Sequence, residues 1–136
     1  MKVLKSKFDS EFDVTHMDID EMYPIDKEKK VVIMKFMKKF AKEFPKKGML
    51  FPLIVYPTKN SDNLGARILN KRIPYAVWYG CNRLRFAVYQ QYTHISVVIV
   101  QNEKECDAVL AKIFALGKQK EEFKTINDLN YIKQTY

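Results

Sequence analysis

Residues 75–91 read YAVWYGCNRLRFAVYQQ, a β-like run that reaches Gly80 and turns directly into a helical pattern. A strand that stops at glycine and enters a helix directs several backbone N–H groups and the positive helix end at one point. That arrangement suits a phosphate group, and we expect the guanidinium of Arg83 to close over the same anion through a charge-assisted fork. The alternative is an ordinary strand-to-helix turn with a buried cysteine and a surface arginine.

The composition indicates one globular domain with a basic surface. The chain has 136 residues, of which 47% are hydrophobic and 13% aromatic, enough for a core. Its 24 Lys and Arg residues against 16 Asp and Glu residues give a formal net charge of +8, which favours nucleic acid or nucleotide phosphates as partners. No apolar run approaches the roughly 20 residues that cross a bilayer, and the N-terminus lacks a signal-peptide pattern. We therefore expect a cytoplasmic protein that does not bind membranes.

The residues that usually hold metals do not form a metal-binding pattern. Cys81 and Cys106 are too few for a disulfide framework, and with the two separated histidines they do not match metal-ligand spacing. We expect reduced thiols and no metal site. Asp18, Asp20 and Glu21 form a small acidic group that would suit magnesium in a nuclease, although such groups more often form turns and caps.

Hydrophobic periodicity predicts the remaining elements. They are a short strand at 14–19, an amphipathic helix at 27–44, a proline-bounded strand at 51–57, a strand at 95–100, and a helix at 104–116 closed by Gly117. Residues 2–12 have no clear period and fit either an arm or an edge strand. Residues 58–72 form a basic loop, and we expect Lys71 and Arg72 to contact nucleic acid together with Arg85.

This order of elements resembles the ParB/sulfiredoxin superfamily. In ParB-like domains a Gly-Glu-Arg-Arg motif opens a helix that continues with an aromatic residue and alanine, and Gly80, Arg83, Phe86 and Ala87 match that motif. The resemblance covers about residues 14–116. It implies an α/β (α+β) fold, a small mixed sheet flanked by helices. The whole chain, 1–136, would then be one domain with a charged tail at 117–136.

Sulfiredoxins are similar over the same turn, because their motif is Gly-Cys-His-Arg followed by a helix that ends in Tyr-Gln-Gln. Gly80, Cys81 and Arg83 occupy the corresponding positions, and Asn82 replaces the histidine. The resemblance implies that Cys81 is the working thiol and that residues 80–83 hold ATP phosphate. Helix N-termini and neighbouring arginines are surroundings in which cysteines become reactive.

Three hypotheses about function follow. The first is a phosphate-binding module that holds a nucleotide, ATP or CTP with magnesium, or a nucleic acid at Gly80, Cys81, Asn82 and Arg83. Its short, lysine-rich character suggests a phage or mobile-element origin. The second is an enzyme, either sulfiredoxin-like and ATP-dependent with Cys81 as nucleophile, or a ParB-like nuclease. The third is a catalytically silent domain that binds a protein partner, because fold alone does not determine function.

Overall fold

The computed structural model describes residues 1–24, 38, 41–42, 49–60 and 73–119. Its strands form one mixed sheet in the order β1-β6-β4-β5-β3, and β2 also pairs with β6. The strands are β1 (Val3–Leu4), β2 (Thr15–Asp18), β3 (Met22–Pro24), β4 (Leu53–Pro57), β5 (Tyr75–Tyr79) and β6 (His94–Ile99). The helices are the 3-10 turns η1 (Asp9–Glu11), η2 (Ile19–Glu21) and η3 (Thr58–Asn60), and the α-helices α3 (Cys81–Tyr89) and α4 (Glu103–Gln119).

Strand β6 organises the sheet, because three strands pair with it. It runs parallel to β1 and β4 and antiparallel to β2. On the far side of β4, strand β5 is antiparallel to β4 and parallel to β3. This mixture of parallel and antiparallel pairs, with helices beside it, confirms the predicted α/β class and the small mixed sheet.

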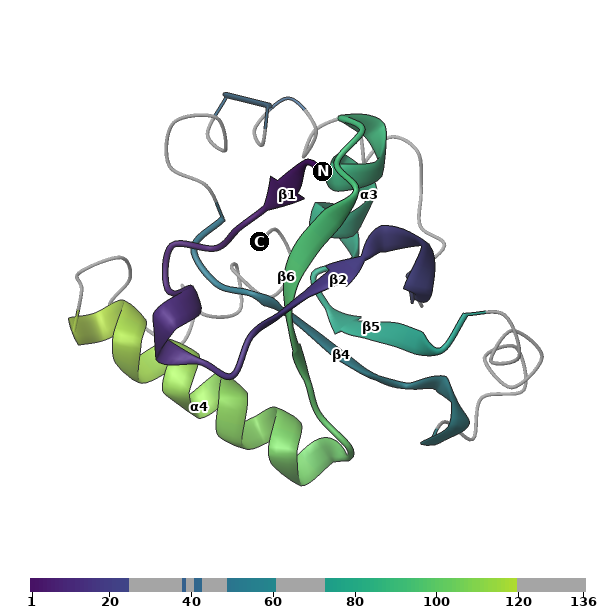
Figure 1. Ribbon diagram of the computed structural model, residues 1–136. Coiled ribbons are helices and arrows are strands. Elements are labelled where there is room, and N and C mark those ends of the chain that lie inside the picture. Colours follow the sequence, from purple (N-terminus) through teal and green to yellow (C-terminus); the bar gives the residue numbers. More distant parts are fainter. Residues whose placement is uncertain (25–37, 39–40, 43–48, 61–72, 120–136) are drawn as a thin grey trace.

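The two faces of the sheet bury different side chains, because residues along a strand alternate between faces. On β4, Leu53 and Val55 pack in the cluster that contains Leu84 and Phe86 of α3. The intervening Ile54 packs in the cluster that contains Cys106 and other residues of α4. Helices α3 and α4 therefore cover opposite faces, and Figure 1 shows α4 along the lower edge of the molecule and α3 at the upper right.

Helix α4 begins at a side-chain cap and buries one stripe. The Asn102 Oδ1 atom accepts a hydrogen bond from the Glu105 backbone N–H at 3.0 Å, which satisfies one of the first N–H groups of the helix. Its buried residues are Cys106, Leu110, Ile113, Leu116 and Gly117, at near-helical spacing. The predicted helix end at Gly117 is wrong. The helix runs to Gln119, and Gly117 lies within it, on the face that packs against the core.

Most other predicted elements are confirmed, with small changes at their ends. The strand at 75–79 has the predicted limits, while those at 14–19, 51–57 and 95–100 appear as β2, β4 and β6. Helix α3 starts at Cys81, directly after the glycine. The segment at 2–12, left open by its pattern, contributes a short strand and the buried side chains of Leu4 and Phe8. The core thus includes residues outside 14–116.

Parts of two predictions fall outside the described residues. Of the predicted helix at 27–44, Lys38, Ala41 and Lys42 are described, and all three are helical and exposed. Of the basic loop predicted at 58–72, Thr58–Asn60 form the 3-10 turn η3, and residues 61–72, with Lys71 and Arg72, lie outside the described residues. No helix among the residues that the structure describes is both long enough and apolar enough to cross a membrane.

Candidate functional site

The turn between β5 and α3 is built on Gly80. This residue has φ 111° and ψ 21°, a left-handed conformation that side chains disfavour. It also lacks space, because a Cβ there would lie 2.6 Å from Cγ of Leu53 and 2.9 Å from Nη2 of Arg83. Glycine is therefore required by backbone geometry and by the close approach of two neighbours.

The first turn of α3 presents backbone N–H groups without a capping side chain. Gly80 is the N-cap and has no side chain that could cap the helix, and the sequence of the first turn contains no acidic residue. The first intrahelical bond runs from the Leu84 N–H to the Gly80 carbonyl at 3.0 Å. The N–H groups of the preceding residues have no carbonyl partner within the helix, and they carry the positive end of its dipole.

The side chain of Arg83 points in a different direction from the one that the sequence pattern predicts. Its side chain is 3% exposed, and its Nη1 donates a hydrogen bond to the backbone carbonyl of Phe51, just before β4. Its Nη2 lies under the Gly80 turn. The guanidinium therefore points into the protein. The expected fork over the outside of the turn is wrong for this conformation, because Arg83 shares the inward face of α3 with Phe86 and Ala87.

The other predicted residues of the turn are half-buried. The Cys81 thiol donates to the Val77 carbonyl at 3.7 Å, and its side chain packs at the margin of the α3-side core. Arg85 Nη1 donates to Asn82 Oδ1 at 3.4 Å. Gly80, Cys81, Asn82, Arg83 and Arg85 are thus brought together at one helix start, with Arg83 beneath it.

Tyr79, the last residue of β5, packs its side chain against the α4-side cluster. Partial burial raises the pKa of Tyr79 above its ordinary value, and negative charge at Cys106, Asp107 and Glu103 on α4 raises it further. At neutral pH the phenol is therefore uncharged.

A polar cluster that the sequence does not predict surrounds Asp9. Its Oδ2 accepts a hydrogen bond from the hydroxyl of fully buried Ser96 at 2.7 Å and lies 3.3 Å from His16 Nε2. Its Oδ1 accepts from the hydroxyl and the backbone N–H of Ser6. Because Ser96 belongs to β6, the cluster fastens the N-terminal segment to the centre of the sheet.

Asp9 and Ser96 are separated by 87 positions, so no sequence spacing signals the pair. The geometry differs from a hydrolytic triad, because serine and histidine both contact the carboxylate, and Ser96 is buried. Among the described residues, no three His, Cys, Asp or Glu side chains gather in a way that would hold a metal ion.

Comparison with known proteins finds a likeness of fold. The structure is similar to the crystal structure of sulfiredoxin from Arabidopsis thaliana, with 13% identity and a TM-score of 0.41, over 68% of this chain and 90% of that chain. At this level of similarity, nothing about binding or catalysis follows from it. No protein-family model matches the sequence, and no curated protein matches it.

Proposed function

We propose that this protein binds a phosphate group, of a nucleotide or of a nucleic acid, at the N-terminal end of α3. The observation that carries the proposal is the start of this helix at left-handed Gly80. Its N-cap residue has no side chain, and the sequence of its first turn contains no acidic residue, so the N–H groups of this turn would bind the phosphate oxygens.

The surrounding charges favour an anion at this point. The buried guanidinium of Arg83 lies beneath the turn, and Arg85 lies beside it through its contact with Asn82. The chain as a whole carries a formal charge of +8. In this proposal Arg83 does not touch the ligand. It supplies positive charge from below and holds the turn through the Phe51 carbonyl.

Cys81 has a packing role in the proposed function. Its thiol turns back toward the Val77 carbonyl at the end of β5, and its side chain contacts the core. The ligand candidates are therefore phosphate compounds that are bound without covalent chemistry. ATP and CTP, each with and without magnesium, are the nucleotides to test first.

The test uses two isosteric substitutions that change the net charge equally. Asn82→Asp places a carboxylate in the first turn of α3 and pairs it with Arg85. We expect it to weaken binding of pyrophosphate, ATP or CTP about five- to thirtyfold, measured by calorimetric titration, because the like charge costs about 1–2 kcal/mol at a partly exposed site.

Asn102→Asp is the matched control, because Asn102 caps α4 and not α3. It should change the affinity less than about twofold, since exposed charges at a distance are screened by salt. Equal affinities for the parent and Asn82→Asp, or equal losses of affinity in the two variants, would show that the phosphate does not bind at the start of α3.

A further inference from the structure

A pocket lies at the opposite end of β5 from the Gly80 turn. Its volume is about 380 Å³, near the lower end of the roughly 300–1,000 Å³ typical of small-molecule sites. It is lined by Pro57, Thr58, Lys59, Pro74, Tyr75 and Gln101. Strand β5 begins at Tyr75 and ends at Tyr79, so the pocket and the turn are about 13 Å apart along the strand.

Hydrogen bonds hold the walls of the pocket in place. The Thr58 backbone N–H donates to the Pro74 carbonyl at 2.9 Å, and its hydroxyl donates to the Ile73 carbonyl at 3.0 Å. On the other side, Asn60 Nδ2 donates to the backbone carbonyl of Gln101 at 3.0 Å and to its Oε1 at 3.2 Å. The 3-10 turn η3 thereby ties the start of β5 to the end of β6, and the pocket is formed before a ligand enters.

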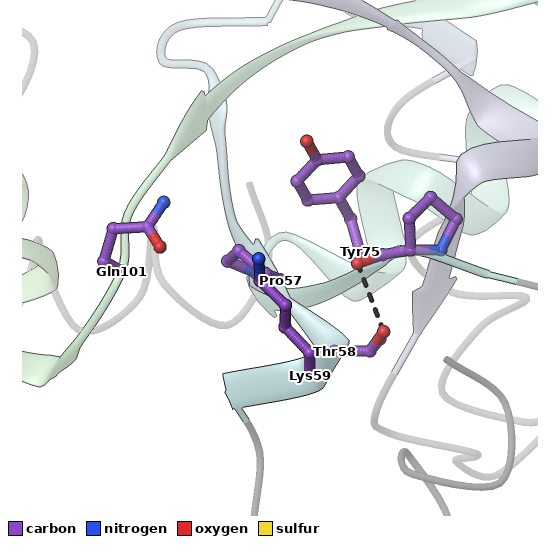
Figure 2. A pocket seen from close by; sticks show the side chains of 6 residues that line it. Pro57, Thr58, Lys59, Tyr75 and Gln101 are labelled. Atoms are coloured by element: carbon purple, nitrogen blue, oxygen red, sulfur yellow. Dashed lines mark hydrogen bonds between the residues drawn. The ribbon is translucent and has the colours of Figure 1, made fainter. Parts of the chain in front are cut away.

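The lining combines an aromatic ring, an amide and a cation. Figure 2 shows Gln101 on one side and Tyr75 on the other, with Pro57 and the amino group of Lys59 between them in this view. Because Asn60 already bonds to Oε1 of Gln101, the N–H groups of that amide are the ones left for a ligand. Lys59 supplies a positive charge and Tyr75 a flat ring, so the lining suits an anionic ligand with a flat ring.

We propose that this pocket binds one nucleotide unit through its base. The base would lie against the ring of Tyr75, a carbonyl or ring nitrogen of the base would accept from the Gln101 amide, and the phosphate would meet Lys59. The unit is either a free mononucleotide or one residue of a single strand, since both offer the same base and phosphate. This site goes beyond the proposed phosphate site and stands without it, because the two share no residue.

The experiment measures the binding of AMP and UMP by calorimetric titration, and of ten-nucleotide dA and dT strands by fluorescence anisotropy. Tyr75→Ile keeps a β-forming apolar residue but removes the ring, and should weaken binding roughly five- to 150-fold. Gln101→Glu keeps an acceptor for Asn60 but replaces the donor by a negative charge, and should weaken binding at least about fivefold. Gln119→Glu, exposed at the end of α4, is the matched control and should change nothing.

The pattern of losses shows which ligand, if any, the pocket binds. Losses in both pocket variants with mononucleotides and strands alike assign the pocket to a nucleotide unit from either source, and losses with strands alone assign it to single-stranded nucleic acid. If no probe binds, or if the pocket variants bind as the parent does, the proposal is overturned. Should Tyr75→Ile fail to fold, the exposed Gln101→Glu decides alone. A loss in Asn82→Asp with no loss in Gln101→Glu would leave the α3 site standing and remove this one.

Discussion

Nη2 of Arg83 lies 2.9 Å from the position that a Cβ of Gly80 would occupy, so the arginine passes directly beneath the turn that starts its own helix. The same guanidinium donates to the Phe51 carbonyl through Nη1. The turn, the start of α3 and the segment before β4 are therefore joined through one buried side chain. A cation beneath a helix N-terminus makes the outer side of that turn more attractive to a phosphate group.

Gly80→Ala should destabilise the protein strongly. The added methyl group would collide with Leu53 and Arg83, and the alanine backbone would have to keep the left-handed φ of residue 80. Together these two effects cost about 2–5 kcal/mol of folding stability. Urea unfolding followed by circular dichroism measures the loss. Val88→Ala on the exposed side of α3, where the side chain is 56% exposed, should change stability by less than about 0.5 kcal/mol. A Gly80→Ala protein as stable as Val88→Ala would refute the described turn.

Arg83→Ala should lower the free energy of unfolding, whereas Arg85→Ala should leave it nearly unchanged. Removing Arg83 takes away buried packing and the hydrogen bond to Phe51, a loss of about 2–5 kcal/mol. Arg85 is half-buried and makes a long contact with Asn82. Thermal unfolding of the two variants tests this difference. Equal melting temperatures would mean that the Arg83 guanidinium faces the solvent.

The stability of the protein should fall at alkaline pH partly through Tyr79. Its pKa in the folded protein is raised, so at a pH above the ordinary tyrosine value of about 10 the unfolded chain ionises first. The contribution of protonated Tyr79 to the free energy of unfolding is fully present below about pH 10, and it is lost as the pH rises through the folded-state pKa. Tyr79→Phe removes it, so the unfolding free energy of the variant should fall less steeply above pH 10. Parallel curves for parent and variant would contradict the assignment.

The two cysteines should differ in their reaction with a thiol reagent. Cys106 is 1% exposed in the α4-side core, so its modification requires opening of the structure, while Cys81 is half-buried at the turn. We expect Cys81 to react more than about a hundredfold faster in the native protein, as followed by mass spectrometry of the parent and Cys81→Ser. Pyrophosphate should slow the reaction of Cys81, because the bound anion lies at the same helix start. Similar rates for both thiols would contradict the packing described for Cys106.

The strands and helices were predictable because they depend on local periodicity. The apolar run of β5, the glycine after it and the helical pattern of α3 lie within 17 consecutive residues of sequence, 75–91. The inward course of Arg83 depends on Phe51, which lies 32 positions earlier. A signal for it exists in the sequence, since Arg83 precedes Phe86 and Ala87 by helical spacing.

Other features depend on contacts that sequence patterns do not reveal. The Asp9 cluster brings Ser96 to the N-terminal segment across 87 positions. The pocket at the start of β5 brings Gln101 to Asn60 across 41 positions. Neither arrangement has a periodicity or a motif. The Asp9 cluster arises when β1 and β2 pair with β6, and the pocket arises when β4 pairs with β6.

The measurement that tests the central claim most directly is a titration of the ¹⁵N-labelled protein with pyrophosphate, observed through its backbone amide resonances. If a phosphate group binds at the start of α3, the amides of Cys81, Asn82 and Arg83 should show the largest shifts, and these shifts should saturate. Asn82→Asp should reduce them, and Asn102→Asp should leave them intact. Shifts that do not saturate, or that appear at the start of α4 and not at residues 81–83, would contradict the claim.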